Sequence, residues 1–273
     1  MKNIKKGTID IILYVIVFAV MQIFVSLLGI FVWMQLKGMS FAGVQSLLQN
    51  GELPALLAVT TVMSNLITFL IFVRAKWVNA SKDYLRSKPW ASLLWVALFT
   101  LGMLIPLDFI YEHLGLEMDP RTEHIFTALL KEPWGYVAVG ILAPLTEEVV
   151  FRGAILRTLL GMVSKKNHWV AILISAAIFG GLHGNEAQFV HALIMGLFLG
   201  WMYYRTNSII PGLLLHWVNN TMAYVLTNLL PQSDGKLIDL FGGNERTVYY
   251  AVGFSLCIAV PSFIQLMGRL GKK

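Results

Sequence analysis

The sequence predicts an all-α, polytopic membrane protein with about eight transmembrane helices and an active site within the bilayer. Of the 273 residues, 57% are hydrophobic and only 13% are charged, and the mean hydropathy is +0.68. Soluble domains carry about 25% charged residues, so most of this surface should face something other than water. The apolar residues are also gathered in long runs, which favours a single membrane domain over one or two soluble domains.

Eight apolar runs approach the length of about 20 helical residues that crosses a hydrocarbon layer about 30 Å thick. The first four and the last are clear, and the other three are shorter or weaker. In chain order they are Ile9–Leu36, Pro54–Val73, Pro89–Tyr111, Trp134–Leu156, Trp169–His183, Phe189–Tyr204, Ile209–Leu230 and Val248–Met267. We expect the single domain (1–273) to comprise N-terminal spans and loops (1–133), a motif-bearing catalytic core (134–230) and a last loop and span (231–273).

Basic residues support this arrangement because they cluster in alternate loops. They precede the first span, fill the loop after the second, follow the fourth, end the sixth and close the chain, whereas the intervening loops are mixed or acidic. The protein is therefore expected in the plasma membrane, with both termini in the cytoplasm. Topology explains the net charge of +6, so no nucleic-acid partner is expected. Cys257 is the only cysteine, which excludes an intrachain disulfide.

The fourth run carries three ionisable residues, Glu147, Glu148 and Arg152. Each such group costs about 2.5–3.5 kcal/mol near the centre of a membrane helix. Glu148 and Arg152 are four residues apart, so they share a helix face and can pair. Glu147 is rotated by about 100° from that face in an α-helix and should point elsewhere. A carboxylate not paired by its own helix should accept a proton readily, so Glu147 is the candidate general base. The alternative is that Arg152 only reaches the membrane interface and the glutamates neutralise it.

Two later runs carry histidines at helical spacing from a second side chain. Phe179 precedes His183 by one turn, so its ring can wall one side of the imidazole. His216 and Asn220 share a face and could donate hydrogen bonds to one oxyanion. By a count of about 1.5 Å per residue, Glu147 and His216 lie at matching depths, whereas His183 lies about 11 Å away. His191, in the sixth run, has no polar partner at helical spacing and is interpreted as packing.

Glu147-Glu148-x-x-x-Arg152, Phe179-x-x-x-His183 and His216-x-x-x-Asn220, in this order on successive apolar segments, resemble the three motifs of the CPBP (Abi) family of CAAX prenyl endopeptidases and bacteriocin-processing enzymes. The resemblance covers 134–230. It implies that Glu147 and His183 activate a water molecule and that His216 and Asn220 stabilise the oxyanion. Glu148 and Arg152 would support them.

Zinc would require three protein ligands and a water molecule, and Glu147, His183 and His216 could supply the ligands. The sequence lacks His-Glu-x-x-His and any other short ligand pair on one helix, so we expect no required cofactor, with zinc as the alternative. The expected partners are membrane lipids and a substrate that is a peptide or lipidated protein. The alternative to an enzyme is a non-proteolytic bacteriocin-immunity or scaffold protein of the same fold. A transporter would be expected to show inverted repeats, and the sequence has none.

Overall fold

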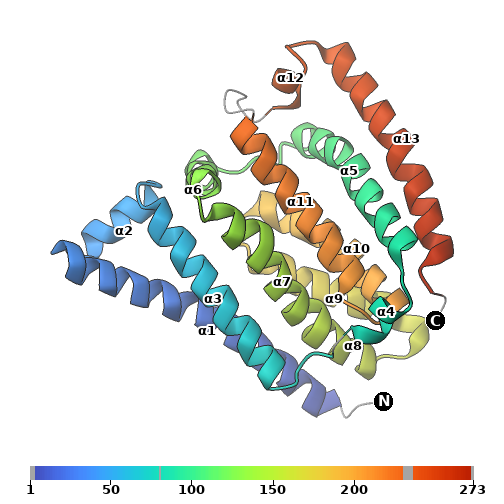
Figure 1. Cartoon of the computed structure of the whole chain (residues 1–273), viewed down its shortest axis with the longest axis horizontal. Helices are drawn as coiled ribbons and strands as arrows, with labels where there is room; N and C mark the ends of the chain where they lie inside the picture. Colours follow the sequence, from blue (N-terminus) through green and yellow to red (C-terminus); the bar gives the residue numbers. More distant parts are fainter. Residues whose placement is uncertain (1–3, 80, 230–235, 272–273) are drawn as a thin grey trace. The chain divides into compact units, whose positions relative to one another are not determined.

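The computed structural model describes residues 4–79, 81–229 and 236–271, and all regular secondary structure in these ranges is helical (Figure 1). The all-α prediction is therefore confirmed. Among the described residues, five helices are long and apolar enough to cross a membrane. They are α1 (Ile4–Lys37), α3 (Pro54–Arg74), α5 (Trp90–His113), α10 (Glu186–Thr206) and α13 (Glu245–Arg269). The chain is a polytopic helical membrane protein, but the expected number of eight spans is not confirmed.

The other three expected spans are helical but fall short in different ways. The fourth run forms η1 (Tyr136–Leu142), α7 (Ala143–Glu147) and η2 (Glu148–Leu156), in which π-helical and α-helical turns alternate, and α8 (Arg157–Met162) continues it. After the short η3 (Lys165–Asn167), α9 (His168–Gly181) has 14 residues, or about 21 Å, less than the layer of about 30 Å. The last, α11 (Ile210–Leu229), has 20 residues, but a histidine and three asparagines interrupt its apolar sequence.

Pro144 gives a local reason for the π-helical turns of η1. In an α-helix its ring would clash with the carbonyl of Gly140, and it has no N–H to donate to that carbonyl. A wider turn, with hydrogen bonds from residue i to residue i+5, moves the carbonyl away from the ring. η1 accordingly ends at Leu142, just before the proline, and regular α-helix resumes in α7.

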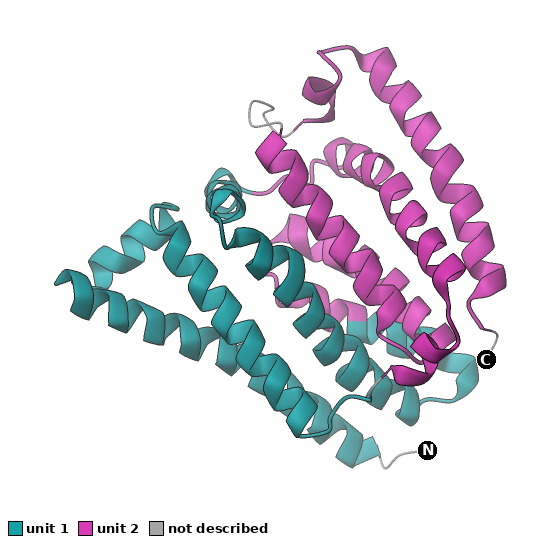
Figure 2. Cartoon of the chain, viewed as in Figure 1, with its two compact units in different colours: residues 1–79, 119–175 teal, residues 80–118, 176–273 magenta. Residues whose placement is uncertain are grey.

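The chain forms two compact units, each built from segments distant in sequence (Figure 2). Unit 1 comprises 1–79 and 119–175, and unit 2 comprises 80–118 and 176–273. In unit 1, α3 packs along α1 and against η1 and α7, while η2 and α8 contact α1. The short helices α2 (Phe41–Gln49) and α6 (Pro120–Lys131) contact each other. The segment that carries Glu147 is thus held by the two long helices of its own unit.

In unit 2, α5 packs against α13 and α11, and α10 packs against α11. The buried core includes Phe99, Leu199, Met202 and Leu215. Two short helices, α4 (Lys82–Arg86) and α12 (Leu237–Leu240), lie in the connections. This unit holds the segments that carry both histidine motifs.

Candidate active site

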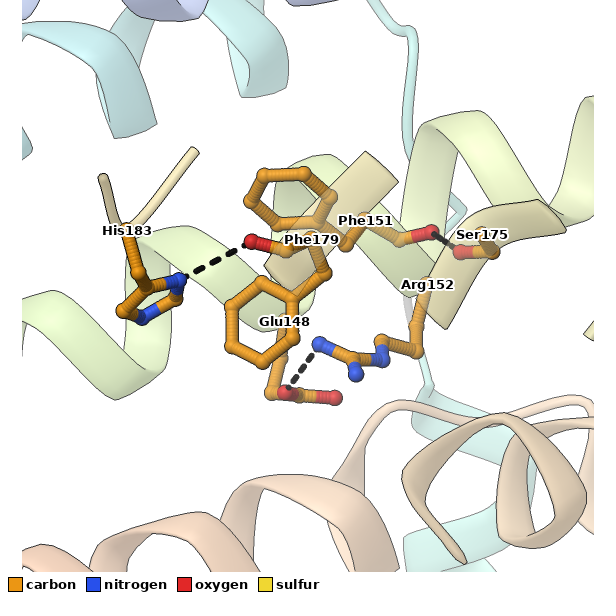
Figure 3. A network of polar contacts seen from close by, with 6 residues as sticks. All are labelled: Glu148, Phe151, Arg152, Ser175, Phe179 and His183. Carbon is orange, nitrogen blue, oxygen red and sulfur yellow. Dashed lines mark hydrogen bonds and ion pairs between the residues drawn. The ribbon is translucent and has the colours of Figure 1, made fainter. Parts of the chain in front are cut away.

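The buried ion pair expected in the fourth run is present in unit 1. Arg152 Nη1 lies 2.9 Å from Glu148 Oε1, and the two side chains are 1% and 0% exposed (Figure 3). Both residues belong to η2, so the pairing at a spacing of four survives in a π-helical segment. Because removing either charge leaves the other buried, the pair fixes the two side chains in one arrangement.

Glu147 lies at the junction of α7 and η2. The carboxylate is half-buried at the end of α7, and the charge of Arg152 interacts with Glu147 as well as with Glu148. Charges this close in sequence interact whichever way the two side chains point. The expected direction of the Glu147 side chain, away from Arg152, therefore stays a prediction. Glu148 provides the larger of the two interactions.

His183 lies just beyond the end of α9, in unit 2. Its Nδ1 is 2.9 Å from the carbonyl oxygen of Phe179, one turn earlier (Figure 3). A carbonyl can only accept a hydrogen bond, so Nδ1 carries the hydrogen, and the neutral ring presents a lone pair on Nε2. Gly184 follows with φ of +81°, a backbone conformation that favours glycine, and turns the chain toward α10. The helix end thus fixes both the position and the tautomer of this imidazole.

The ring of Phe179 makes edge-to-face (T-shaped) contacts with both motif histidines of unit 2. Its ring centroid is 4.9 Å from that of His183 and 5.9 Å from that of His216, at interplanar angles of 88° and 78°. His216, in α11, is buried. The predicted role of Phe179 as a wall of the His183 imidazole is therefore confirmed, and the same ring also borders His216.

Asn220 follows His216 by four residues on α11, as the sequence predicts. The side-chain nitrogen of Asn219 donates a 3.2 Å hydrogen bond to Oδ1 of Asn220. With Oδ1 oriented in this way, Asn220 presents its amide hydrogens as donors. A histidine and an oriented amide on one helix face are suitable donors for a negatively charged oxygen.

His191, which the sequence placed in packing, lies in α10. Its ring lies 5.7 Å from that of Tyr111, and its imidazole interacts electrostatically with His216 and His183. These neighbours come from other helices, so spacing within α10 could not reveal them. The packing role of His191 stays a prediction.

The predicted site residues are thus grouped within each unit. Unit 1 brings Glu147, Glu148 and Arg152 together, and unit 2 brings Phe179, His183, His191 and His216 together. The zinc set expected as an alternative, Glu147, His183 and His216, draws one ligand from unit 1 and two from unit 2. Within either unit, the described side chains include no group of three His, Cys, Asp or Glu residues that could hold a metal ion. Neither unit alone supplies, among its described residues, the three protein ligands that zinc requires.

Comparison with protein families gives a match over the part of the chain that carries all three motifs. Residues 129–222 match the family model described as type II CAAX prenyl endopeptidase Rce1-like. The matched range begins before Glu147 and ends after Asn220, so it includes every predicted site residue. A comparison with solved structures found no significant match.

Similar curated proteins include two with names that state a peptidase. The chain is 24% identical over 197 residues to the putative membrane peptidase YdiL of Bacillus subtilis, which covers 68% of this chain and 79% of the relative. It is 27% identical over 178 residues to the membrane-embedded CAAX protease MroQ of Staphylococcus aureus, covering 61% and 71%. A third, UPF0177 protein YxdF of Lactococcus lactis, is 32% identical over 104 residues, covering 38% and 51%. The resemblance to CAAX prenyl endopeptidases that the motifs indicated is confirmed, and it supports a membrane peptidase.

Proposed function

We propose that this protein is an intramembrane endopeptidase that hydrolyses a peptide bond with water activated by Glu147 and His183. The observation that carries the proposal is the half-buried Glu147 beside the fully buried Glu148–Arg152 pair, inside the range that matches a peptidase family. A buried charge pair in an apolar segment is expensive. A hydrolase has a use for a carboxylate held in one place, whereas helix packing alone does not require it.

The proposed reaction assigns one task to each group. Glu147 takes a proton from water, and the lone pair on Nε2 of His183 accepts a hydrogen bond from the same water molecule. The water oxygen bonds to the scissile carbonyl carbon, and His216 and Asn220 donate hydrogen bonds to the oxyanion that forms. When the carbon–nitrogen bond breaks, the proton on Glu147 passes to the leaving amine. The reaction requires Glu147 and His183 to reach one water molecule.

Glu148 and Arg152 support the reaction without touching the substrate. Their ion pair fixes the π-helical turn that follows Glu147. Arg152 also interacts with Glu147 and thereby holds a positive charge near the proposed base.

The substrate is proposed to be a membrane-associated peptide or a lipidated protein tail. The name of the S. aureus relative includes CAAX protease, which makes a prenylated C-terminus one candidate, and a bacteriocin leader or signalling propeptide is another. We further propose a plasma-membrane location with both termini in the cytoplasm. Accessibility of single cysteines introduced near each terminus to a membrane-impermeant thiol reagent tests this orientation.

The deciding experiment compares the Glu147→Gln protein with the wild type in proteoliposomes. Glu123→Gln, which changes an exposed glutamate in the first turn of α6, is the control for loss of one carboxylate. The probes are synthetic peptides that end in a cysteine with or without a farnesyl group. In a second experiment, mass spectrometry identifies the membrane peptides of cells that express each variant. We expect Glu147→Gln to abolish cleavage and Glu123→Gln to retain it. Cleavage by Glu147→Gln at the wild-type rate would overturn the proposal in favour of a scaffold or immunity role.

Metal dependence is tested on the same proteoliposomes. We propose hydrolysis without a required metal, which predicts full activity after dialysis against a chelator and no stoichiometric zinc by elemental analysis. Loss of activity that returns with added zinc would instead favour the ligand set Glu147, His183 and His216.

A further inference from the structure

We infer that two buried hydroxyl groups, those of Thr146 and Ser175, act as positioning residues for Glu147 and Arg152. The inference rests on the proposed function. Each hydroxyl donates a hydrogen bond to a main-chain carbonyl of another segment of unit 1, and each bond lies next to one of the two charged residues. One bond therefore holds the backbone just before the Glu148–Arg152 turn and the other holds it within that turn, next to Arg152.

Thr146 immediately precedes Glu147 and is completely buried. Its hydroxyl donates a 3.0 Å hydrogen bond to the main-chain carbonyl of Asn65 in α3. A carbonyl oxygen has two lone pairs, so it can accept this bond without giving up a helical one. The side-chain amide of Asn65 donates to the carbonyl of Thr61, within its own helix. The bond from Thr146 thus fixes the backbone next to Glu147 against a neighbouring helix of the same unit.

Ser175 holds the backbone within the turn. It is 2% exposed in α9, and its hydroxyl donates a 3.1 Å hydrogen bond to the main-chain carbonyl of Phe151 in η2 (Figure 3). Phe151 immediately precedes Arg152. The hydroxyl consequently fixes the backbone from which the guanidinium projects toward Glu148.

These two bonds differ from those of four other buried hydroxyls in the described part of the chain. A threonine or serine in an apolar helix ordinarily bonds to a carbonyl four residues earlier in its own helix. Four buried residues do so, at 2.7–2.8 Å: Thr60, Thr68, Thr100 and Ser262. Such bonds stabilise nothing beyond their own helix. Thr146 and Ser175 instead link separate segments, and both links end beside the acid motif.

The physical need for such links comes from the π-helical turns. π-helical segments are rare and short, so η2 depends on its surroundings to keep its form. A donor in an apolar environment has no water to replace its partner, so losing the bond leaves a polar group unsatisfied. A misplacement of about 1 Å at a catalytic group can lower a rate by about 100-fold, so small backbone shifts near Glu147 should affect the rate of reaction more than substrate binding.

The test replaces each linking hydroxyl and a matched non-linking one. Thr146→Val removes the hydroxyl at constant shape, Thr146→Ser restores it, and Thr68→Val makes the same change at a buried threonine that bonds within α3. Ser175→Ala is paired in the same way with Ser262→Ala, whose hydroxyl bonds within α13. Cleavage of the better farnesylated or unmodified peptide probe gives kcat and KM for each variant, and thermal unfolding gives their stability.

We expect Thr146→Val and Ser175→Ala to lower kcat by about 10-fold to 100-fold with KM changed less than about twofold. Thr146→Ser should recover most of kcat. Thr68→Val and Ser262→Ala should keep the wild-type kcat, although they should lose as much thermal stability as Thr146→Val and Ser175→Ala do. If Thr146→Val does not fold, Ser175→Ala carries the test. Equal kcat in the linking variants and their matched controls would overturn the inference. Active Glu147→Gln protein would overturn the proposed function itself, so the two failures are distinguishable.

Discussion

Replacing Arg152 tests how much the buried pair contributes to stability. At 2.9 Å and an effective dielectric constant of about 20, the attraction between Arg152 and Glu148 is about 6 kcal/mol before desolvation is subtracted. Arg152→Met leaves the carboxylate of Glu148 in a completely buried position. The carboxyl group can escape this by taking up a proton, which costs about 4 kcal/mol at pH 7 from its ordinary value of about 4.3. We therefore expect a loss of about 4 kcal/mol in the free energy of unfolding.

Glu148→Gln should destabilise the protein less than Arg152→Met does. The guanidinium stays charged but keeps its interaction with Glu147, so the expected loss is about 1–3 kcal/mol, as for an imperfectly satisfied buried group. In the double variant, Arg152→Met with Glu148→Gln, no ionised carboxylate remains at position 148. The loss in its free energy of unfolding should therefore be smaller than the sum of the two single losses by about 2 kcal/mol or more.

The measurement is reversible unfolding of purified protein in mixed micelles, at several pH values. In Arg152→Met the folded state holds a proton that the unfolded chain releases above about pH 4.3, so stability should fall as the pH rises, by up to about 1.4 kcal/mol per unit. The difference between Arg152→Met and the wild type should consequently shrink from pH 8 to pH 5. Single losses that add within about 0.5 kcal/mol, with no dependence on pH, would refute the reasoning.

Three further predictions concern packing and helix ends. Arg205 donates three hydrogen bonds to carbonyls at the end of α13. Arg205→Ala should therefore lower the free energy of unfolding by about 1.5–3 kcal/mol and speed hydrogen exchange at the end of that helix. Unchanged hydrogen exchange would contradict this prediction. A Cβ on Gly102 would lie 2.7 Å from a backbone nitrogen of α13, so Gly102→Ala should cost about 1–3 kcal/mol in thermal unfolding, whereas Gly253→Ala, in open space, should not. The hydrogen bonds from Thr122 lower the pKa of Asp119, the N-cap of α6. The cap should therefore stabilise the helix fully above the ordinary pKa of Asp, and this stabilisation should be lost as the pH falls through the lower pKa of the folded state. Hydrogen exchange in the first turn of α6 should become faster at low pH, and Asp119→Asn should remove this pH dependence.

The long helices could be predicted from the sequence because hydrophobic length alone determines them. The runs beginning at Ile9, Pro54, Pro89, Phe189 and Val248 all correspond to helices able to cross a membrane. The fourth, fifth and seventh runs could not be counted so simply, although the fourth was expected to be a clear span and the sixth, expected to be weaker, is long and apolar enough. Polar motifs interrupt them, and a run of apolar residues does not reveal whether its turns are α-helical or π-helical.

The acid motif shows how far helical spacing can be used. Glu148 and Arg152 pair as predicted because residues four apart stay close in both kinds of helix. The expected direction of the Glu147 side chain stays a prediction, because the interaction of Glu147 with the charge of Arg152 does not fix that direction. The interaction matters for the proposed chemistry, since it involves the carboxylate that should take the proton.

Thr146 and Ser175 mark the limit of reasoning from sequence, because hydroxyl residues are unremarkable in apolar helices. The sequence around Thr68 gives the same signal as that around Thr146, yet one hydroxyl bonds within its helix and the other to a different one. Only the coordinates separate the two cases. The distinction matters most beside Glu147, because hydrogen bonds within a helix cannot fix that helix against its neighbours. The proposed catalytic carboxylate, next to a π-helical segment, therefore requires donors that cross between segments, and its neighbour in sequence supplies one.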